Sequence, residues 1–222
     1  MRIFICAYRD WGIKVYSALR QVFPKHEIYL ATNPKELTDI YSTNGIPDAV
    51  FCVGWSWRVE SFLTDATWVI GVHPSNLPEF AGGSPIQNQI LSGVSDTKMT
   101  LFRMTAKLDE GPILAKLPLS LNGHMHEIFE RLTLTSLLLF ADFLRNFPNI
   151  KLLPNSGPQE NIRLYSRLPP SASQLSRDDL AKKSARDLYN LIRSHEDPYP
   201  NCYFEDDSGR IIFKLCEFTE NQ

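Results

Sequence analysis

The chain has 222 residues, of which 43% are hydrophobic and 22% are charged, proportions that are typical of a globular domain and exclude a disordered chain. Its 23 Lys and Arg residues nearly balance its 25 Asp and Glu residues, so the chain lacks the basic character of a nucleic-acid binder and we expect no nucleic-acid partner. No segment has the roughly 18 apolar residues of a membrane span, and the N-terminal sequence does not resemble a signal peptide. These features predict a cytoplasmic protein with no membrane partner. The four cysteines show no metal-ligand spacing, so we expect reduced thiols and no metal.

Short apolar segments alternate with amphipathic ones over the first 73 residues. This rhythm predicts strands at residues 2–7, 27–31, 48–53 and 68–73, separated by helices at residues 11–23, 34–41 and 59–64. Strands and helices that alternate in this way form right-handed βαβ units around a parallel sheet. We therefore predict an α/β fold whose N-terminal half is Rossmann-like.

The pattern changes after residue 73. We predict a helix at residues 86–92, strands at 98–105 and 113–119, a long helix at 124–147, a proline-containing linker at 149–173, a helix at 182–194, and strands at 202–205 and 211–218. The Asp207-Ser208-Gly209 turn between the last two strands indicates a hairpin. Residues 1–150 are thus predicted to form a core with a mostly parallel sheet, and residues 151–222 a linker, a helix and a C-terminal β-hairpin. His195 lies among polar residues and is predicted at the surface.

Two polar residues are candidates for chemistry. His73 closes the fourth predicted strand, and an open α/β sheet binds its ligands beyond the carboxyl ends of the strands. Asp109 lies in the turn between the strands at 98–105 and 113–119, and a carboxylate beside a histidine would fix its tautomer and favour its protonated form. Each residue also has a plain alternative, namely a histidine at the surface or satisfied within the core, and an aspartate that only stabilises its turn.

A glycine-rich segment follows the His73 loop. Gly82 and Gly83 have no side chain to keep a ligand away from the backbone, and Ser84 precedes a predicted helix whose first N–H groups are free. Many loops contain adjacent glycines, so this segment does not identify a site by itself.

Three motifs follow one another along the chain: His73-Pro74-Ser75-x-Leu77-Pro78, Gly82-Gly83-Ser84-Pro85-Ile86, and Leu108-Asp109-x-Gly111-Pro112-Ile113. This set resembles the formyltransferase family that uses 10-formyltetrahydrofolate, which includes methionyl-tRNA formyltransferase, glycinamide ribonucleotide transformylase and the sugar N-formyltransferases. The resemblance covers about residues 48–120 and continues through Arg193 and Asp197-Pro198-Tyr199-Pro200, which look most like the sugar enzymes. It implies a Rossmann-like formyltransferase core.

The resemblance also implies roles for individual residues. His73 and Asp109 match the catalytic histidine and aspartate of the family, whereas Gly71 stands where the family has a catalytic asparagine. Asn76 could supply the missing amide, or it could only shape its loop, as asparagine often does. The residues implied in substrate or cofactor binding are Gly54, Trp55, Ser75, Gly82, Gly83, Ser84 and Gly111.

The activity implied by the resemblance is transfer of a formyl group from 10-formyltetrahydrofolate to an amine. Protonated His73 would stabilise the developing oxyanion, and Asp109 would orient His73 and help to move a proton. The expected acceptor is a nucleotide-linked amino sugar, because the tRNA enzyme carries an additional C-terminal domain and a basic surface, whereas this chain ends at Gln222 with a formal net charge of −2. Two alternatives stay open: an enzyme like glycinamide ribonucleotide transformylase, and a non-catalytic protein that binds folate or a nucleotide sugar, which Gly71 favours. The family also implies a homodimer, formed through the C-terminal hairpin.

Overall fold

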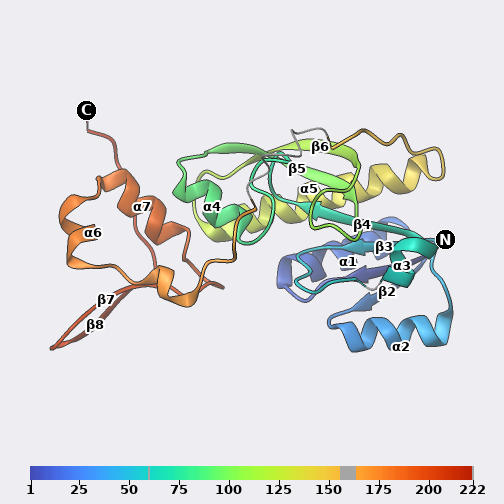
Figure 1. Ribbon diagram of the computed structural model, residues 1–222, viewed down its shortest axis with the longest axis horizontal. Coiled ribbons are helices and arrows are strands. Elements are labelled where there is room, and N and C mark those ends of the chain that lie inside the picture. Colours follow the sequence, from blue (N-terminus) through green and yellow to red (C-terminus); the bar gives the residue numbers. More distant parts are fainter. Residues whose placement is uncertain (60, 156–163, 222) are drawn as a thin grey trace.

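The computed structural model describes residues 1–59, 61–155 and 164–221, except for the side chains of residues 61 and 62. Its centre is a six-stranded sheet with the strand order β2-β1-β3-β4-β5-β6 (Figure 1). The strands are β1 (Arg2–Cys6), β2 (Glu27–Ala31), β3 (Ala49–Cys52), β4 (Trp68–His73), β5 (Asp96–Arg103) and β6 (Ile113–Ser120). The first four in the spatial order pair in parallel, whereas β5 is antiparallel to both β4 and β6. The predicted α/β fold with a mostly parallel sheet is confirmed.

Helices cover both faces of this sheet (Figure 1). The helices are α1 (Asp10–Val22), α2 (Pro34–Asn44), α3 (Ser61–Ala66), α4 (Pro85–Leu91) and α5 (Met125–Asn146). Because side chains alternate along a strand, β3 contributes Phe51 to one face and Val50 to the other. Phe51 stacks on Phe140 of α5 at a centroid distance of 4.3 Å, and Val50 packs in the cluster that contains Leu37 of α2. We call these the α1/α5 face and the α2/α3 face.

The C-terminal residues form a short 3-10 helix (Pro170–Ser173), two helices and a two-stranded hairpin, namely α6 (Arg177–Lys182), α7 (Ala185–Arg193), β7 (Cys202–Asp206) and β8 (Gly209–Phe213). The helix predicted at residues 182–194 is present as α7 but begins only at Ala185, and α6 was not predicted. Lys183 has an extended backbone (φ −75°, ψ 146°), and the Ser184 side chain accepts a hydrogen bond from the Asp187 N–H and so starts a new helix. The hairpin is confirmed, although its second strand ends at Phe213. No helix in the described ranges is long and apolar enough to cross a membrane.

Two buried charged residues join the C-terminal part to the core. Arg193, at the end of α7, donates hydrogen bonds to two backbone carbonyl oxygens just before α5, at 2.5 and 3.0 Å. The Glu196 carboxylate lies 2.8 Å from Nδ1 of His124 and accepts a hydrogen bond of 2.8 Å from the N–H of Met125, at the start of α5. His195 lies between these residues and is buried, so its predicted surface position is wrong. This burial lowers the pKa of His195.

Candidate active site

A cavity of about 560 Å³ opens at the carboxyl ends of β1, β3 and β4. The strand order reverses between β1 and β3, and an open α/β sheet leaves a ligand crevice at such a point. The cavity extends from this crevice past β4, so that both Gly54 after β3 and His73 at the end of β4 line it. Its volume is in the range of small-molecule sites.

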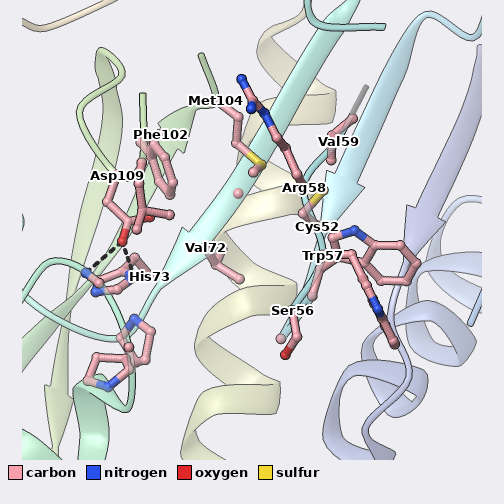
Figure 2. Close-up of a pocket in the computed structure, with 18 of the residues that line it drawn as sticks. Cys52, Ser56, Trp57, Arg58, Val59, Val72, His73, Phe102, Met104 and Asp109 are labelled. Atoms are coloured by element: carbon pink, nitrogen blue, oxygen red, sulfur yellow. Dashed lines mark hydrogen bonds and ion pairs between the residues drawn. The ribbon is translucent and has the colours of Figure 1, made fainter. Parts of the chain in front are cut away.

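His73 and Asp109 meet in this cavity (Figure 2). Nδ1 of His73 lies 3.5 Å from Oδ2 of Asp109, and the two side chains are only 8% and 10% exposed. The same Oδ2 accepts a hydrogen bond from the Gly82 N–H at 2.8 Å, and Nε2 of His73 lies 2.9 Å from the carbonyl oxygen of Phe80. Each ring nitrogen of His73 therefore faces an oxygen that can accept a hydrogen bond, and the 80–82 segment holds both members of the pair.

Asp109 reaches His73 by an indirect route. β5 runs antiparallel to β4, with Arg103 opposite Ile70, so the loop that follows β5 begins near the amino end of β4. Residues 104–112 must then fold back toward the carboxyl end of β4 before the carboxylate can meet the histidine. The spacing of the two motifs predicts the pair only if this reversal takes place.

Close backbone packing holds the 104–112 loop in shape. Asp109 has φ +54°, a left-handed conformation that Asp and Asn adopt more readily than most residues. The buried Asn155 donates a hydrogen bond of 2.9 Å to the Asp109 carbonyl oxygen. A Cβ atom on Gly111 would lie 1.7 Å from the carbonyl oxygen of Arg103, so only glycine fits there. Gly111 thus shapes the loop and does not line the cavity.

Gly82 and Gly83 make room for another segment of the chain. Tyr165 forms a parallel bridge with Gly82, and its carbonyl oxygen accepts a hydrogen bond of 2.7 Å from the Gly83 N–H. A Cβ atom on Gly82 would lie 2.4 Å from this oxygen, and one on Gly83 would lie 2.4 Å from the Arg167 nitrogen. Although both glycines line the cavity, their lack of side chains serves packing against residues 164–168, which we call the strap.

The residues that line the cavity come from both faces of the sheet, and we call its two sides the apolar lobe and the basic lobe. The apolar lobe, on the α2/α3 face, is lined by Cys52, Val59 and Met104. The basic lobe, on the α1/α5 face, contains Arg9, Arg167 and Tyr199 besides the apolar rings of Trp11 and Phe129. The histidine–aspartate pair lines the same cavity at the end of β4. Within the described part of the chain no group of His, Cys, Asp and Glu could hold a metal ion.

The predicted binding residues fall into two groups. Those that line the cavity are Gly54, Trp55, Gly82, Gly83 and Ser84. Ser75 is buried within the His73 loop, where its hydroxyl donates a hydrogen bond of 2.6 Å to the Glu79 carbonyl oxygen, and Gly111 packs against β5. Sequence reasoning missed Arg9, Arg167 and Tyr199. Arg9 had a signal, because it follows the first strand and therefore lies at the same sheet edge as His73. Tyr199 belongs to the Asp197-Pro198-Tyr199-Pro200 motif, but that motif did not indicate a place in the cavity.

Asn76 is held outside the cavity by other side chains. Its Oδ1 accepts a hydrogen bond of 2.8 Å from Nζ of Lys116, and its Nδ2 donates one of 3.3 Å to Glu79. We therefore expect Asn76→Ala to lower the free energy of unfolding by about 1 kcal/mol, as for a lost hydrogen bond, and to leave turnover per folded molecule unchanged. Thermal unfolding and turnover measured on the same preparation check this. A loss of turnover of about a hundredfold at an unchanged melting temperature would instead indicate an oxyanion donor.

Gly71 has side chains where an asparagine would extend. Its backbone is outside the left-handed region, but a Cβ atom would lie 3.0 Å from Cε1 of Phe102 and 3.2 Å from Sδ of Met104. We expect Gly71→Asn alone to lower stability by about 1–3 kcal/mol, as overpacking does, without a gain in turnover.

In Gly71→Asn/Met104→Ala the thioether is gone, and there we expect the restored amide to raise turnover over Met104→Ala alone. Equal turnover in these last two proteins would contradict the prediction.

The formyl transferase family model matches residues 30–128, a range that contains His73 and Asp109. These residues belong to the formyl transferase family. The predicted family membership is thereby confirmed for this range. A methionyl-tRNA formyltransferase of Lysinibacillus sphaericus is 30% identical over 186 residues, which are 80% of this chain and 56% of the relative. The matched part of the chain thus spans little more than half the length of this methionyl-tRNA formyltransferase.

Solved structures resemble the chain beyond the matched range of the formyl transferase domain. The methionyl-tRNA formyltransferase from Clostridium thermocellum has a TM-score of 0.85 and 25% sequence identity, and the likeness covers 99% of this chain and 94% of that chain. A 4-N formyltransferase from Francisella tularensis has a TM-score of 0.72 and 17% identity, and covers 99% of this chain and 98% of its own. The second likeness concerns the fold alone.

Proposed function

We propose that the chain transfers a formyl group from 10-formyltetrahydrofolate to the amine of a nucleotide-linked amino sugar. The observation that carries this proposal is the nearly buried His73–Asp109 pair in a cavity that has an apolar and a basic side. A transfer between two substrates needs a space for each and a proton-moving group where they meet. The family membership of residues 30–128 supports the formyl group as the unit that is transferred.

The apolar lobe suits the ring system of the folate donor. Apolar side chains line it, and Trp55 borders it with an indole N–H that is buried and has no hydrogen-bond acceptor among the described residues. A buried donor without an acceptor costs free energy, so a ligand atom that accepts its hydrogen bond would be favoured there. We therefore propose that the folate lies between the Gly54 strand end, the His73 loop and the 104–112 loop.

His73 would stabilise the negative charge that develops on the formyl oxygen as the amine attacks. Its Nε2 is engaged by the Phe80 carbonyl oxygen at 2.9 Å, so we assign this donation to Nδ1, which Asp109 holds at the longer distance of 3.5 Å. The Gly82 N–H fixes the carboxylate, and the carboxylate in turn orients the ring. Asp109 would also help to carry the proton that the attacking amine loses to the folate nitrogen, whose bond to the formyl carbon then breaks so that tetrahydrofolate leaves.

A second acceptor is methionyl-tRNA, which the similarity to methionyl-tRNA formyltransferases favours. The near balance of charge in this chain does not favour a large polyanion, because phosphate contacts need many basic residues. Glycinamide ribonucleotide is a third acceptor, and a non-catalytic binding protein is the remaining alternative.

One assay separates these functions. The chain is incubated with 10-formyltetrahydrofolate and, in turn, with nucleotide-linked amino sugars, glycinamide ribonucleotide or methionyl-tRNA, and the release of tetrahydrofolate is followed. Release with an amino sugar supports the proposal, and release only with one of the other acceptors replaces it. Folate binding without release in the presence of any amine would identify a non-catalytic binder.

We also propose that residues 1–150 form the catalytic core and that residues 151–222 complete the basic lobe and form a homodimer contact. Tyr199 supports the first part, because it comes from the C-terminal region and lines the cavity. Ile211 and Ile212 of the hairpin support the second, because they are 62% and 53% exposed.

A further inference from the structure

The basic lobe contains two guanidinium groups that no carboxylate of the described residues neutralises. Arg9 follows β1 and Arg167 belongs to the strap, and both line the cavity. Neither forms an ion pair with any residue that the structure describes, whereas Arg2 and Arg210 each pair with a glutamate. Two uncompensated cations beside one another favour an anion between them.

Aromatic rings hold Arg9 without neutralising its charge. Its Cζ lies 5.2 Å from the ring centroid of Tyr8 and 5.6 Å from that of Tyr199. The Tyr199 hydroxyl has no hydrogen-bond partner in the described ranges, and burial raises the pKa of this side chain, so the hydroxyl keeps its proton. The Tyr199 hydroxyl and the Arg9 guanidinium are thus hydrogen-bond donors that line the same cavity, and no acceptor for the hydroxyl lies among the described residues.

The strap brings the second cation to the same place. The Leu168 N–H donates a hydrogen bond of 3.1 Å to Oγ of Ser84, which ties the strap to the start of α4. Nη2 of Arg167 donates one of 2.9 Å to Oγ of Ser56, and this hydroxyl lies 2.7 Å from the hydroxyl of Tyr8. Arg167 is therefore placed beside the residue that precedes Arg9, and the side chain to which it donates this hydrogen bond is a neutral hydroxyl.

The position of the lobe indicates which substrate would bring the anion. The folate occupies the apolar lobe under the proposed function, and Arg58, which Figure 2 shows beside Met104 and Val59, is available there for its carboxylates. The amine must approach the formyl carbon from the other side, which is the side of Arg9 and Arg167. The basic lobe therefore belongs to the acceptor.

An exposed aromatic ring lies next to these donors. Trp57 is 41% exposed, and its ring packs edge-on against Tyr8 at a centroid distance of 4.8 Å. A flat base can stack on such a ring, while planar guanidinium groups bind phosphate oxygens in pairs. On this basis we propose that Arg9, Arg167 and the Tyr199 hydroxyl bind the diphosphate of a nucleotide-linked acceptor, and that Trp57 stacks on its base. This assignment rests on the proposed function and names the part of the acceptor that the chain recognises.

The test measures binding to the full chain without folate, by calorimetry with uridine, thymidine and guanosine diphosphates. We expect at least one of them to bind, with an affinity that falls as ionic strength rises. Arg9→Gln and Arg167→Gln should each weaken this binding by about tenfold or more, the effect of losing a charge-assisted hydrogen bond. The matched control is Arg20→Gln, because Arg20 lies over the ring of Tyr16 on α1 at 5.6 Å but does not line the cavity.

Several results would overturn the assignment. These are no affinity of the wild-type chain for any nucleoside diphosphate, equal affinity in the two variants, equal losses in Arg20→Gln, or tighter binding of cytidylyl-adenosine, whose phosphodiester resembles the end of a tRNA. Circular dichroism shows whether Arg9→Gln and Arg167→Gln are folded. If either is unfolded, the conservative variant Arg9→Lys or Arg167→Lys is used in its place. If the diphosphate binds as expected but no amine is formylated, the anion site stands and the proposed function fails.

Discussion

The His73→Gln variant is expected to lose formyl transfer by a factor of about 10²–10⁴, the usual contribution of a positioned acid–base group. The glutamine amide can still donate a hydrogen bond to the Phe80 carbonyl oxygen, which now lies 2.9 Å from Nε2. It cannot carry a positive charge toward the formyl oxygen, and it cannot transfer a proton. His73→Ala is a weaker test, because an unsatisfied carbonyl oxygen at this site would add a stability loss of about 1–3 kcal/mol.

The measurement is tetrahydrofolate release per folded molecule, with the melting temperature followed by circular dichroism. His126→Gln serves as the control, because His126 is exposed on α5 and does not line the cavity. The control should keep full turnover. Turnover close to the wild-type level in folded His73→Gln would remove His73 from the reaction.

Asp109→Asn is expected to lower turnover by a similar factor of about 10²–10⁴, because it removes the charge that orients His73 and accepts a proton. The substitution keeps the local structure. Asparagine tolerates the φ of +54° at this position, and its side-chain oxygen can still accept the hydrogen bond of the Gly82 N–H. Alanine would add backbone strain of about 1–2 kcal/mol and confuse the two effects.

A double variant tests whether the two residues act as a unit. Because the ring and the carboxylate stabilise the same transition state as one pair, His73→Gln/Asp109→Asn should turn over no more slowly than the slower single variant. Losses that multiply would show that each residue makes its own contact with the reacting atoms. Asp142→Asn, an exposed change on α5, is the matched control for the loss of one carboxylate.

Local patterns were sufficient for the strands around the histidine. The predicted strands at residues 27–31 and 68–73 coincide with β2 and β4, and Asn33 caps α2 as its place before Pro34 suggests. These features depend on neighbours within a few residues, so periodicity and turn residues report them. The helix predicted at residues 182–194 is present, but it begins only at Ala185. Ser184 caps α7 and so separates it from α6. The spacing of apolar residues on either side continues through this point and therefore does not reveal the break.

The sequence by itself determined an α/β sheet, a histidine at the end of its fourth strand and the family to which residues 30–128 belong. The tertiary structure decided how Asp109 meets that histidine, because the antiparallel register of β5 sends the connecting loop away before it returns. It also decided that Gly82 and Gly83 receive the strap, and that residues as distant as Arg9 and Arg167 line one lobe. Such contacts follow from backbone pairing between remote segments, and the spacing of residues along the chain does not encode which segments pair.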